Sequence, residues 1–162
     1  MKITLTLNEK ETALDADSNE RLSSVLRRNN YRSIKAGCGH TSCGNCCTVL
    51  LDGLPVSSCM IPVGIVHGSA IVTLEHYEKS AVYSDIMHGF SRAGIVLCGY
   101  CNSAKIFAAH HVITHYKRPT RRIIDAAVRH LAPCCIDKDT LINGIIYASD
   151  SYAKHMGAHS VR

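Results

Sequence analysis

The sequence predicts an α+β fold, with a small sheet and one helix in the first half and short packed helices in the second. Polar and apolar side chains alternate around short turns in residues 2–16 and 48–59, which is typical of β-hairpins. Apolar residues between 82 and 152 recur every three or four positions, as on the buried faces of helices. The chain has 162 residues, which is enough for one ordinary domain or two small ones.

The first half predicts two hairpins, one helix and a last strand. Leu22, Val25 and Leu26 form one apolar face at helical spacing, and we expect a short helix there. Residues 35–47 are small, polar and rich in cysteine, which indicates a loop. The strands of the predicted sheet are residues 2–7, 11–16, 48–51, 54–59 and 71–74.

The second half predicts four helices that pack together. Ile86 and Phe90 lie four positions apart on the first of them, and the other helices show similar apolar spacing. The residues from Lys154 onward lack periodicity, so we expect an irregular tail. The predicted helices are residues 82–93, 103–116, 119–131 and 141–152.

Composition excludes several classes of protein. Hydrophobic residues make up 46% of the chain and charged residues 19%, which is unlike a disordered segment. No apolar run approaches the roughly 20 residues of a membrane-spanning helix. The net charge of +5 is too small to predict a nucleic-acid partner. Residues 1–7 lack the apolar core of a secretion signal, so we expect a cytoplasmic protein.

Cysteine is the unusual feature of the composition, with nine residues beside ten histidines. Thiols stay reduced in the cytosol, which favours metal binding over a disulfide framework. Buried structural cysteines would be scattered along the chain, whereas these form groups. The nine are Cys38, Cys43, Cys46, Cys47, Cys59, Cys98, Cys101, Cys134 and Cys135.

The first group has the spacing of a plant-type 2Fe–2S site. Cys38, Cys43 and Cys46 follow the pattern C-x4-C-x2-C, and Cys59 lies further on. Glycines in the loop let the backbone approach the cluster and donate N–H groups to its sulfurs. The interval from Cys38 to Cys43 is too wide for a zinc knuckle.

Four motifs in the first half resemble the iron–sulfur subunit of molybdenum hydroxylases, the xanthine dehydrogenase, aldehyde oxidase and carbon monoxide dehydrogenase family. The resemblance implies a ferredoxin-like β-grasp domain over residues 1–76, in which Cys38, Cys43, Cys46 and Cys59 hold the first 2Fe–2S cluster. The motifs are Gly37–Gly39, Cys43–Cys46, Thr48–Gly53 and Ser58–Cys59.

The identity of the third ligand stays open between two adjacent residues. Members of the family usually have eleven residues between the third and fourth ligands. Eleven residues separate Cys47 from Cys59, and twelve separate Cys46 from it. Cys46 keeps the short spacing of the cluster loop, whereas Cys47 keeps the hairpin spacing. We favour Cys46, because a loop around a cluster tolerates a change of length less than the start of a hairpin does.

The second group extends the resemblance over most of the chain. Cys98 and Cys101 form a C-x2-C, which alone fits zinc, a redox dithiol or an iron–sulfur site. In the family, C-G-x-C is followed after about thirty residues by C-x-C, inside a four-helix bundle. The resemblance therefore implies a helical 2Fe–2S domain over residues 77–153, with residues 154–162 as a disordered tail. Its implied ligands are Cys98, Cys101, Cys134 and Cys135.

The second half also departs from the family. Cys134 and Cys135 are adjacent, where the family has one residue between its last two ligands. Neighbouring side chains in extended backbone point to opposite faces, so binding through both requires a local adjustment. Leu97 stands where a pterin-contacting glutamine is common, and Asn102–Ala104 replaces a usual Thr-Pro-Gly. These changes weaken the case for contact with a molybdopterin.

Other candidate residues have plainer interpretations. His40 is a possible ligand of a Rieske-like variant, but four cysteines are already at hand. His110, His111 and His115 lie at helical spacing without the glutamate of a zinc protease, and we interpret them as a helix face. Basic residues around Pro119 predict a solvated turn or a contact with a partner subunit. These are Lys117, Arg118, Arg121 and Arg122.

The sequence therefore predicts an electron-transfer subunit of an oxidoreductase, with two 2Fe–2S clusters and no substrate site of its own. By resemblance, it passes electrons from a molybdenum–pterin centre on a large subunit to FAD on a medium subunit. Two alternatives stay open. One is a single-cluster, ferredoxin-like carrier with a degenerate second site. The other is a zinc-stabilised interaction module without a redox role.

Overall fold

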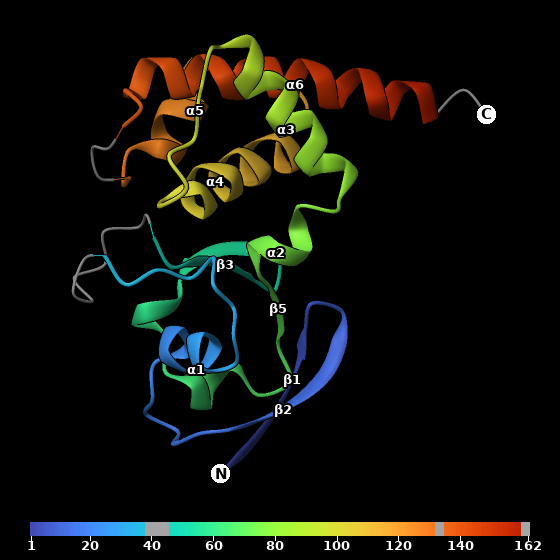
Figure 1. Cartoon of the computed structure of the whole chain (residues 1–162). Coiled ribbons are helices and arrows are strands. Elements are labelled where there is room, and N and C mark those ends of the chain that lie inside the picture. The colour runs from blue at the N-terminus through green and yellow to red at the C-terminus, as the bar shows by residue number, and fades with distance from the viewer. Residues whose placement is uncertain (38–45, 132–134, 160–162) are drawn as a thin grey trace.

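The computed structural model describes residues 1–37, 46–131 and 135–159. One half of the molecule is a sheet with a helix packed on it, and the other half is helical (Figure 1). The chain completes the sheet before it enters the helical half. This arrangement of a mixed sheet followed by packed helices confirms the coarse prediction of a sheet part followed by a helical part. No helix of the described part combines the length and apolarity required to cross a membrane.

The sheet has five strands in the order β2-β1-β5-β3-β4. They are β1 (Lys2–Leu7), β2 (Lys10–Asp15), β3 (Thr48–Leu51), β4 (Leu54–Ser57) and β5 (Ala70–Val72). Among the strand pairs of the described residues, only β1–β5 is parallel. Both predicted hairpins form, and their turn residues have the positive φ angles of tight hairpin turns, as at Asp52 and Gly53.

A helix, α1 (Leu22–Arg28), packs its apolar side against the sheet. The three residues predicted to form its apolar face have no exposed surface, which confirms that prediction. Two short 3-10 helices, Ser58–Met60 and Val63–Val66, lead from β4 towards β5. The side chains of these elements form one hydrophobic core, which also contains Cys47 and Cys59.

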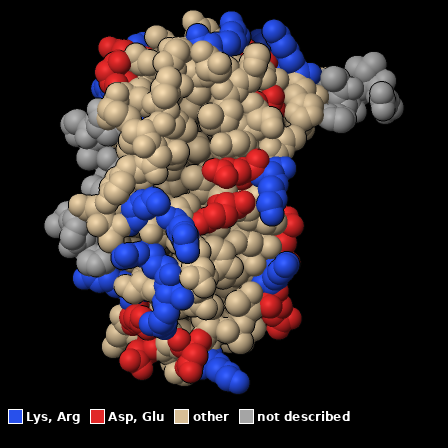
Figure 2. All heavy atoms as spheres, in the orientation of Figure 1, with Lys and Arg blue, Asp and Glu red and all other residues tan. Residues whose placement is uncertain are grey.

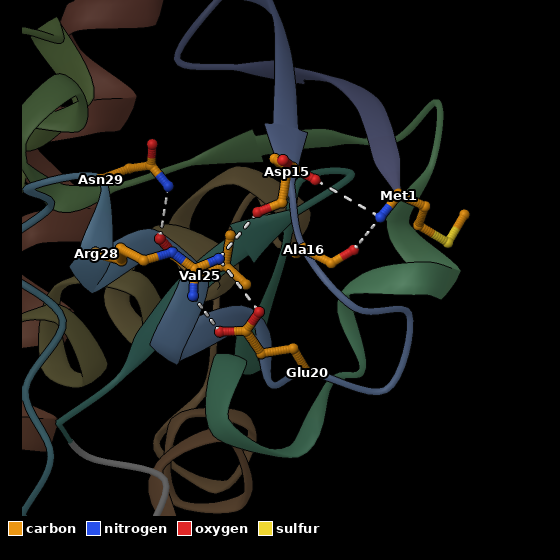
Figure 3. A network of polar contacts seen from close by, with 7 residues as sticks. All are labelled: Met1, Asp15, Ala16, Glu20, Val25, Arg28 and Asn29. Carbon is orange, nitrogen blue, oxygen red and sulfur yellow. Dashed lines mark hydrogen bonds and ion pairs between the residues drawn. The ribbon is translucent and has the colours of Figure 1, made fainter.

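Polar contacts join the start of β1 to the end of β2, and the end of β2 to α1 (Figure 3). The amino group of Met1 donates to the carbonyl of Ala16 over 2.9 Å. The guanidinium of Arg28 donates to the carbonyl of Asp15 over 2.9 Å and also pairs with Glu20. The Arg28 side chain is exposed, so water screens its contacts and they contribute little to stability. They orient the end of α1, while the core supplies the stability.

In the described part of the helical half there are one short and four longer helices. They are α2 (Leu74–Tyr77), α3 (Ala81–Arg92), α4 (Asn102–His115), α5 (Arg121–Val128) and α6 (Lys138–His159). Helices α3 to α6 pack on one another around a second core, which includes Phe90, Phe107 and Ile145. Two residues of the sheet belong to this second core: Leu50 is buried in it, and Val72 is partly buried at its edge. The two halves of the molecule are therefore packed together.

Helices α3 and α6 approach each other at two glycines. A Cβ atom on Gly89 would lie 2.6 Å from the carbonyl oxygen of Gly144 and 2.5 Å from Cα of Ala148. Real Cβ atoms do not come so close to backbone, because the van der Waals radii overlap. Gly89 therefore allows the two helix backbones to touch.

Helix α6 differs from the prediction at its end. The sequence predicts a helix end near residue 152 and an irregular tail from Lys154, whereas α6 continues to His159. Polar contacts with α3 hold the last turns of α6 in place. Asp85 of α3 accepts a hydrogen bond from the hydroxyl of Ser151 over 2.7 Å and lies 3.1 Å from Nδ1 of His155. A search for hydrophobic periodicity does not detect such contacts.

A polar pair joins α2, which follows the sheet, to α4. The hydroxyl of Tyr77 lies 2.8 Å from Nδ1 of His110, and the two rings meet edge to face. Burial raises the pKa of Tyr77, so its hydroxyl stays protonated and can donate to the imidazole. Burial, with the nearby charges of His115 and His111, lowers the pKa of His110 to about 4. The imidazole is therefore neutral in the folded protein at neutral pH.

This pair predicts a loss of stability on acidification. Below the ordinary histidine pKa of 6.5, the unfolded chain takes up a proton that folded His110 binds only near pH 4. The free energy of unfolding should therefore fall as the pH falls through this interval. Urea unfolding at several pH values measures the fall, and His110→Gln should reduce it. His88→Gln, at an exposed site on α3, is the control. An equal pH dependence in wild type and His110→Gln would contradict the assignment.

Candidate metal centres

Three cysteines of the first group, Cys46, Cys47 and Cys59, flank the β3–β4 hairpin. Cys38 and Cys43, together with His40, lie outside the described residues. Cys46 and Cys47 directly precede β3, and Cys59 lies in the 3-10 helix after β4. The hairpin register continues beyond the strands, because the N–H and hydroxyl of Ser58 both donate to the carbonyl of Cys47, over 3.2 and 2.6 Å. Hairpin pairing therefore brings Cys59 beside the Cys46–Cys47 segment.

Cys46 is tied to the chain that enters the cysteine loop. Its sulfur accepts a hydrogen bond from the backbone N–H of Gly37 over 3.2 Å, and its carbonyl accepts one from Lys35 over 2.7 Å. The side chain is 2% exposed. Backbone N–H donors to cysteine sulfur are the contacts that stabilise and tune iron–sulfur clusters. This geometry suits Cys46 as a ligand.

Cys47 has a different environment from Cys46. Its side chain packs within the core of the sheet half, next to Cys59. Burial raises the pKa of the Cys47 thiol to about 11, with a contribution from the neighbouring Cys59. Cys59 is an implied ligand and is buried in the same core, so burial alone does not separate the two residues, whereas the N–H of Gly37 is directed at the sulfur of Cys46. The described contacts thus distinguish the two adjacent residues.

Two cysteines of the second group, Cys98 and Cys101, lie in the turn that precedes α4. Cys98 to Cys101 form a turn in which the N–H of Gly99, at φ 87°, donates to the side-chain oxygen of Asn102 over 3.0 Å. This turn leads directly into the helix. Cys101 is buried, whereas Cys98 and Cys135 are exposed. Cys134 lies outside the described residues.

Electrostatic contacts place three of these thiols near one another. The backbone N–H of Tyr100 is the largest of the influences that lower the pKa of the Cys98 thiol to about 7, and the side chains of Cys135 and Cys101 also contribute. The sulfur of Cys98 is therefore within reach of both Cys101 and Cys135. A thiol with a pKa of about 7 is about half ionised at neutral pH, and the thiolate is the form that binds a metal.

The donor chemistry fits iron–sulfur clusters at both groups. Soft sulfur donors, an N–H directed at sulfur and partial burial are the features such clusters require. Within residues 1–37, 46–131 and 135–159, no three His, Cys, Asp or Glu side chains are arranged to hold one metal ion. Each implied ligand set, however, includes at least one residue beyond those ranges: Cys38 and Cys43 for the first, Cys134 for the second.

Tyr100 connects the two groups. It lies between Cys98 and Cys101, and its ring packs against the backbone of Gly37, which precedes Cys38. A Cβ atom on Gly37 would lie 2.6 Å from Cε1 of this ring. The second cysteine turn therefore contacts the segment that leads into the first cysteine loop.

The other sequence candidates occupy ordinary positions. His110 bonds Tyr77, and the rings of His111 and His115 lie 4.3 Å apart on α4. In the basic segment, Arg121 pairs with Asp139 over 2.7 Å. Basic and acidic side chains lie side by side on the face shown in Figure 2. This mixture of charges gives no uniform basic surface on that face.

The sequence analysis did not identify one residue beside the second cysteine group, Lys105. Lys105 of α4 is only 3% exposed, and its Nζ atom lies 2.8 Å from Sγ of Cys101. Its spacing from Cys101 could have revealed this contact, because two residues four positions apart on a helix lie side by side.

Comparisons of the sequence with known proteins agree with this chemistry. A family model described as a 2Fe-2S iron-sulfur cluster binding domain matches residues 5–64. The small FeS subunit of a nicotinate dehydrogenase from Eubacterium barkeri is 34% identical over 127 residues, which cover 78% of this chain and 80% of that subunit. The iron-sulfur-binding subunit of a xanthine dehydrogenase from Escherichia coli O157:H7 is 35% identical over 106 residues, or 65% of this chain and 66% of that one.

Solved structures share the fold over nearly the whole chain. Quinoline 2-oxidoreductase from Pseudomonas putida 86 superposes with a TM-score of 0.83 at 22% identity, over 95% of this chain and 96% of the matched chain. The aldehyde oxidoreductase from Desulfovibrio desulfuricans ATCC 27774 gives a TM-score of 0.81 at 28% identity. That match covers 96% of this chain and 17% of the much longer enzyme chain.

The fold and the cysteine groups together define an iron–sulfur electron-transfer protein of the oxidoreductases. Its relatives are subunits of dehydrogenases and oxidoreductases, so it is a component of an oxidoreductase. The chain belongs to the iron–sulfur subunits of the molybdenum hydroxylase family. The resemblance inferred from the cysteine motifs is thereby confirmed.

Proposed function

We propose that this chain carries two 2Fe–2S clusters and relays single electrons from a molybdenum–pterin centre to FAD, each bound by a partner subunit. The observation that supports a relay is the contact of Tyr100 with Gly37, since it brings the two cysteine groups together. The proposed ligands are Cys38, Cys43, Cys46 and Cys59 for the first cluster, and Cys98, Cys101, Cys134 and Cys135 for the second.

A bound 2Fe–2S cluster supplies reversible one-electron chemistry. The residues of this chain hold and tune that chemistry. Gly37 donates its N–H to the sulfur of Cys46, and α4 begins directly after Cys101. Donors to sulfur and the degree of burial set the reduction potential.

The proposal extends to the organisation of the chain. We assign residues 1–76 to a ferredoxin-like β-grasp domain and residues 77–153 to a four-helix-bundle domain. The mixed sheet with α1 packed across it supports the first assignment. The mutual packing of α3, α4, α5 and α6 supports the second.

The proposed partners are a large subunit with the molybdenum cofactor and a medium subunit with FAD, in a cytoplasmic complex. The names of the relatives support this, because they describe subunits of larger dehydrogenases. Apolar exposure near the second group is a further support. Val96 and Tyr100, which flank Cys98, are 83% and 49% exposed, and such surface is commonly buried against a partner.

A second candidate is a single-cluster carrier. The adjacency of Cys134 and Cys135 favours it, because side chains of neighbouring residues diverge unless the backbone adjusts. This candidate retains the first cluster and leaves the second group as thiols.

Iron and acid-labile sulfide, counted per chain on anaerobically purified protein, distinguish the candidates. Two clusters predict about four iron and four sulfide per chain, with a red-brown colour. About two of each would support the single-cluster carrier. Colourless protein with stoichiometric zinc would refute both, since zinc is redox-silent.

A further inference from the structure

Lys105 is a buried cation beside a proposed cluster ligand. It lies in the first turns of α4, and its side chain is 3% exposed. Lysine is almost never buried to this degree without a partner, because a buried ammonium loses its hydration and needs acceptors to compensate. The sulfur of Cys101 lies 2.8 Å from Nζ and is such an acceptor.

The chemistry of this pair depends on the state of the sulfur. An ammonium has three donors and no acceptor, and a neutral thiol is a weak acceptor. A thiolate bound to iron keeps negative charge and makes a charge-assisted hydrogen bond, which is stronger than a neutral one. Lys105 is therefore best accommodated when Cys101 is a thiolate, as it is in a cluster.

We propose that Lys105 raises the reduction potential of the second cluster by donating its ammonium N–H to Sγ of Cys101. The inference rests on the proposed function, in which Cys101 is a ligand of that cluster. One electron enters the cluster and reduces one ferric ion to ferrous, and no proton moves and no covalent bond changes. The added negative charge is balanced at short range by Lys105, which favours the reduced state.

The first cysteine group offers an internal comparison. There the described donor to a ligand sulfur is the backbone N–H of Gly37, which carries no net charge. A substitution at Lys105 should therefore alter the second cluster and leave the first unchanged. This asymmetry separates an effect on one ligand from a general loss of stability.

Potentiometric titration monitored by electron paramagnetic resonance tests the proposal on the full chain with both clusters loaded. Lys105→Met removes the charge and keeps a helix-forming side chain of similar length. Its second cluster should have a more negative midpoint than wild type, with the first midpoint unchanged. Lys105→Arg keeps the charge and should stay near wild type. Lys117→Met, at an exposed lysine just beyond α4, is the matched control and should change neither midpoint.

Equal second-cluster midpoints in wild type and Lys105→Met would overturn the proposal. If Lys105→Met does not load its second cluster, Lys105→Gln, with a neutral N–H donor, decides instead. A lower midpoint in that variant supports the proposal, and an unchanged one overturns it. Wild-type protein with iron for only one cluster would refute the two-cluster function itself, and the inference with it. Iron content thus separates the two failures.

Discussion

Gly89→Ala should strongly destabilise the helical half of the protein. The new Cβ would meet the backbone of α6, namely the nitrogen and Cα of Ala148 and the carbonyl of Gly144. Backbone atoms cannot rotate away as a side chain can, so the two helices must separate. Overpacking typically costs about 1–3 kcal/mol, and the contact with backbone places this variant near the upper end of that range. Urea unfolding followed by circular dichroism measures the loss.

Gly157→Ala is the matched control, because it makes the same chemical change on a helix. Gly157 lies near the end of α6, and a Cβ there would meet no atom of another residue within 4 Å. Alanine is the better helix former, and the variant should gain about 0.5 kcal/mol. A Gly89→Ala protein as stable as wild type would show that α3 and α6 do not pack as closely as described.

Cys46→Ala should abolish the first cluster, whereas Cys47→Ala should retain it. Cys46 accepts the N–H of Gly37, at the entry of the cysteine loop. Cys47 packs in the hydrophobic core, where the smaller alanine leaves a modest cavity. The Cys46→Ala chain should lose about two iron atoms relative to wild type, and the Cys47→Ala chain should lose none. Iron analysis with visible spectra measures both.

The two variants check each other, since they truncate neighbouring cysteines with equal exposure. The reverse result, with loss of iron only in Cys47→Ala, would make Cys47 the third ligand. Loss in both variants would show that the segment needs both sulfurs. A thermal unfolding curve for each variant separates ligand loss from misfolding.

Most elements of the fold could be predicted from local pattern. The strand Thr48–Leu51 and the N-terminal hairpin form where alternation predicts them, and α3 and α4 begin within a residue of their predicted starts. The end of α6 could not be predicted in this way. Asp85 secures it from a distant helix, and that contact leaves no periodic trace in the sequence.

For the candidate site too, local features could be predicted from the sequence, and features that depend on tertiary packing could not. Cysteine spacing is local, so both groups and their chemistry can be identified from the sequence. The packing of Tyr100 on Gly37 and the burial of Lys105 depend on how distant segments and whole helices are placed. Cysteine spacing alone does not decide whether Cys46 or Cys47 is the third ligand. The contacts of each sulfur, which the sequence does not reveal, are what differ between the two residues.

The strand order has a consequence for how the protein is made. The central strand β5 pairs with both β1 and β3, and it is the last of the five to leave the ribosome. Until it emerges, the N-terminal hairpin and the β3–β4 hairpin have no shared strand to join them. Pairing over such sequence distances is slow. The sheet can therefore form only shortly before the helices after β5 are synthesised. We expect the nascent chain to need chaperone protection most at that stage, while the strands are still unpaired.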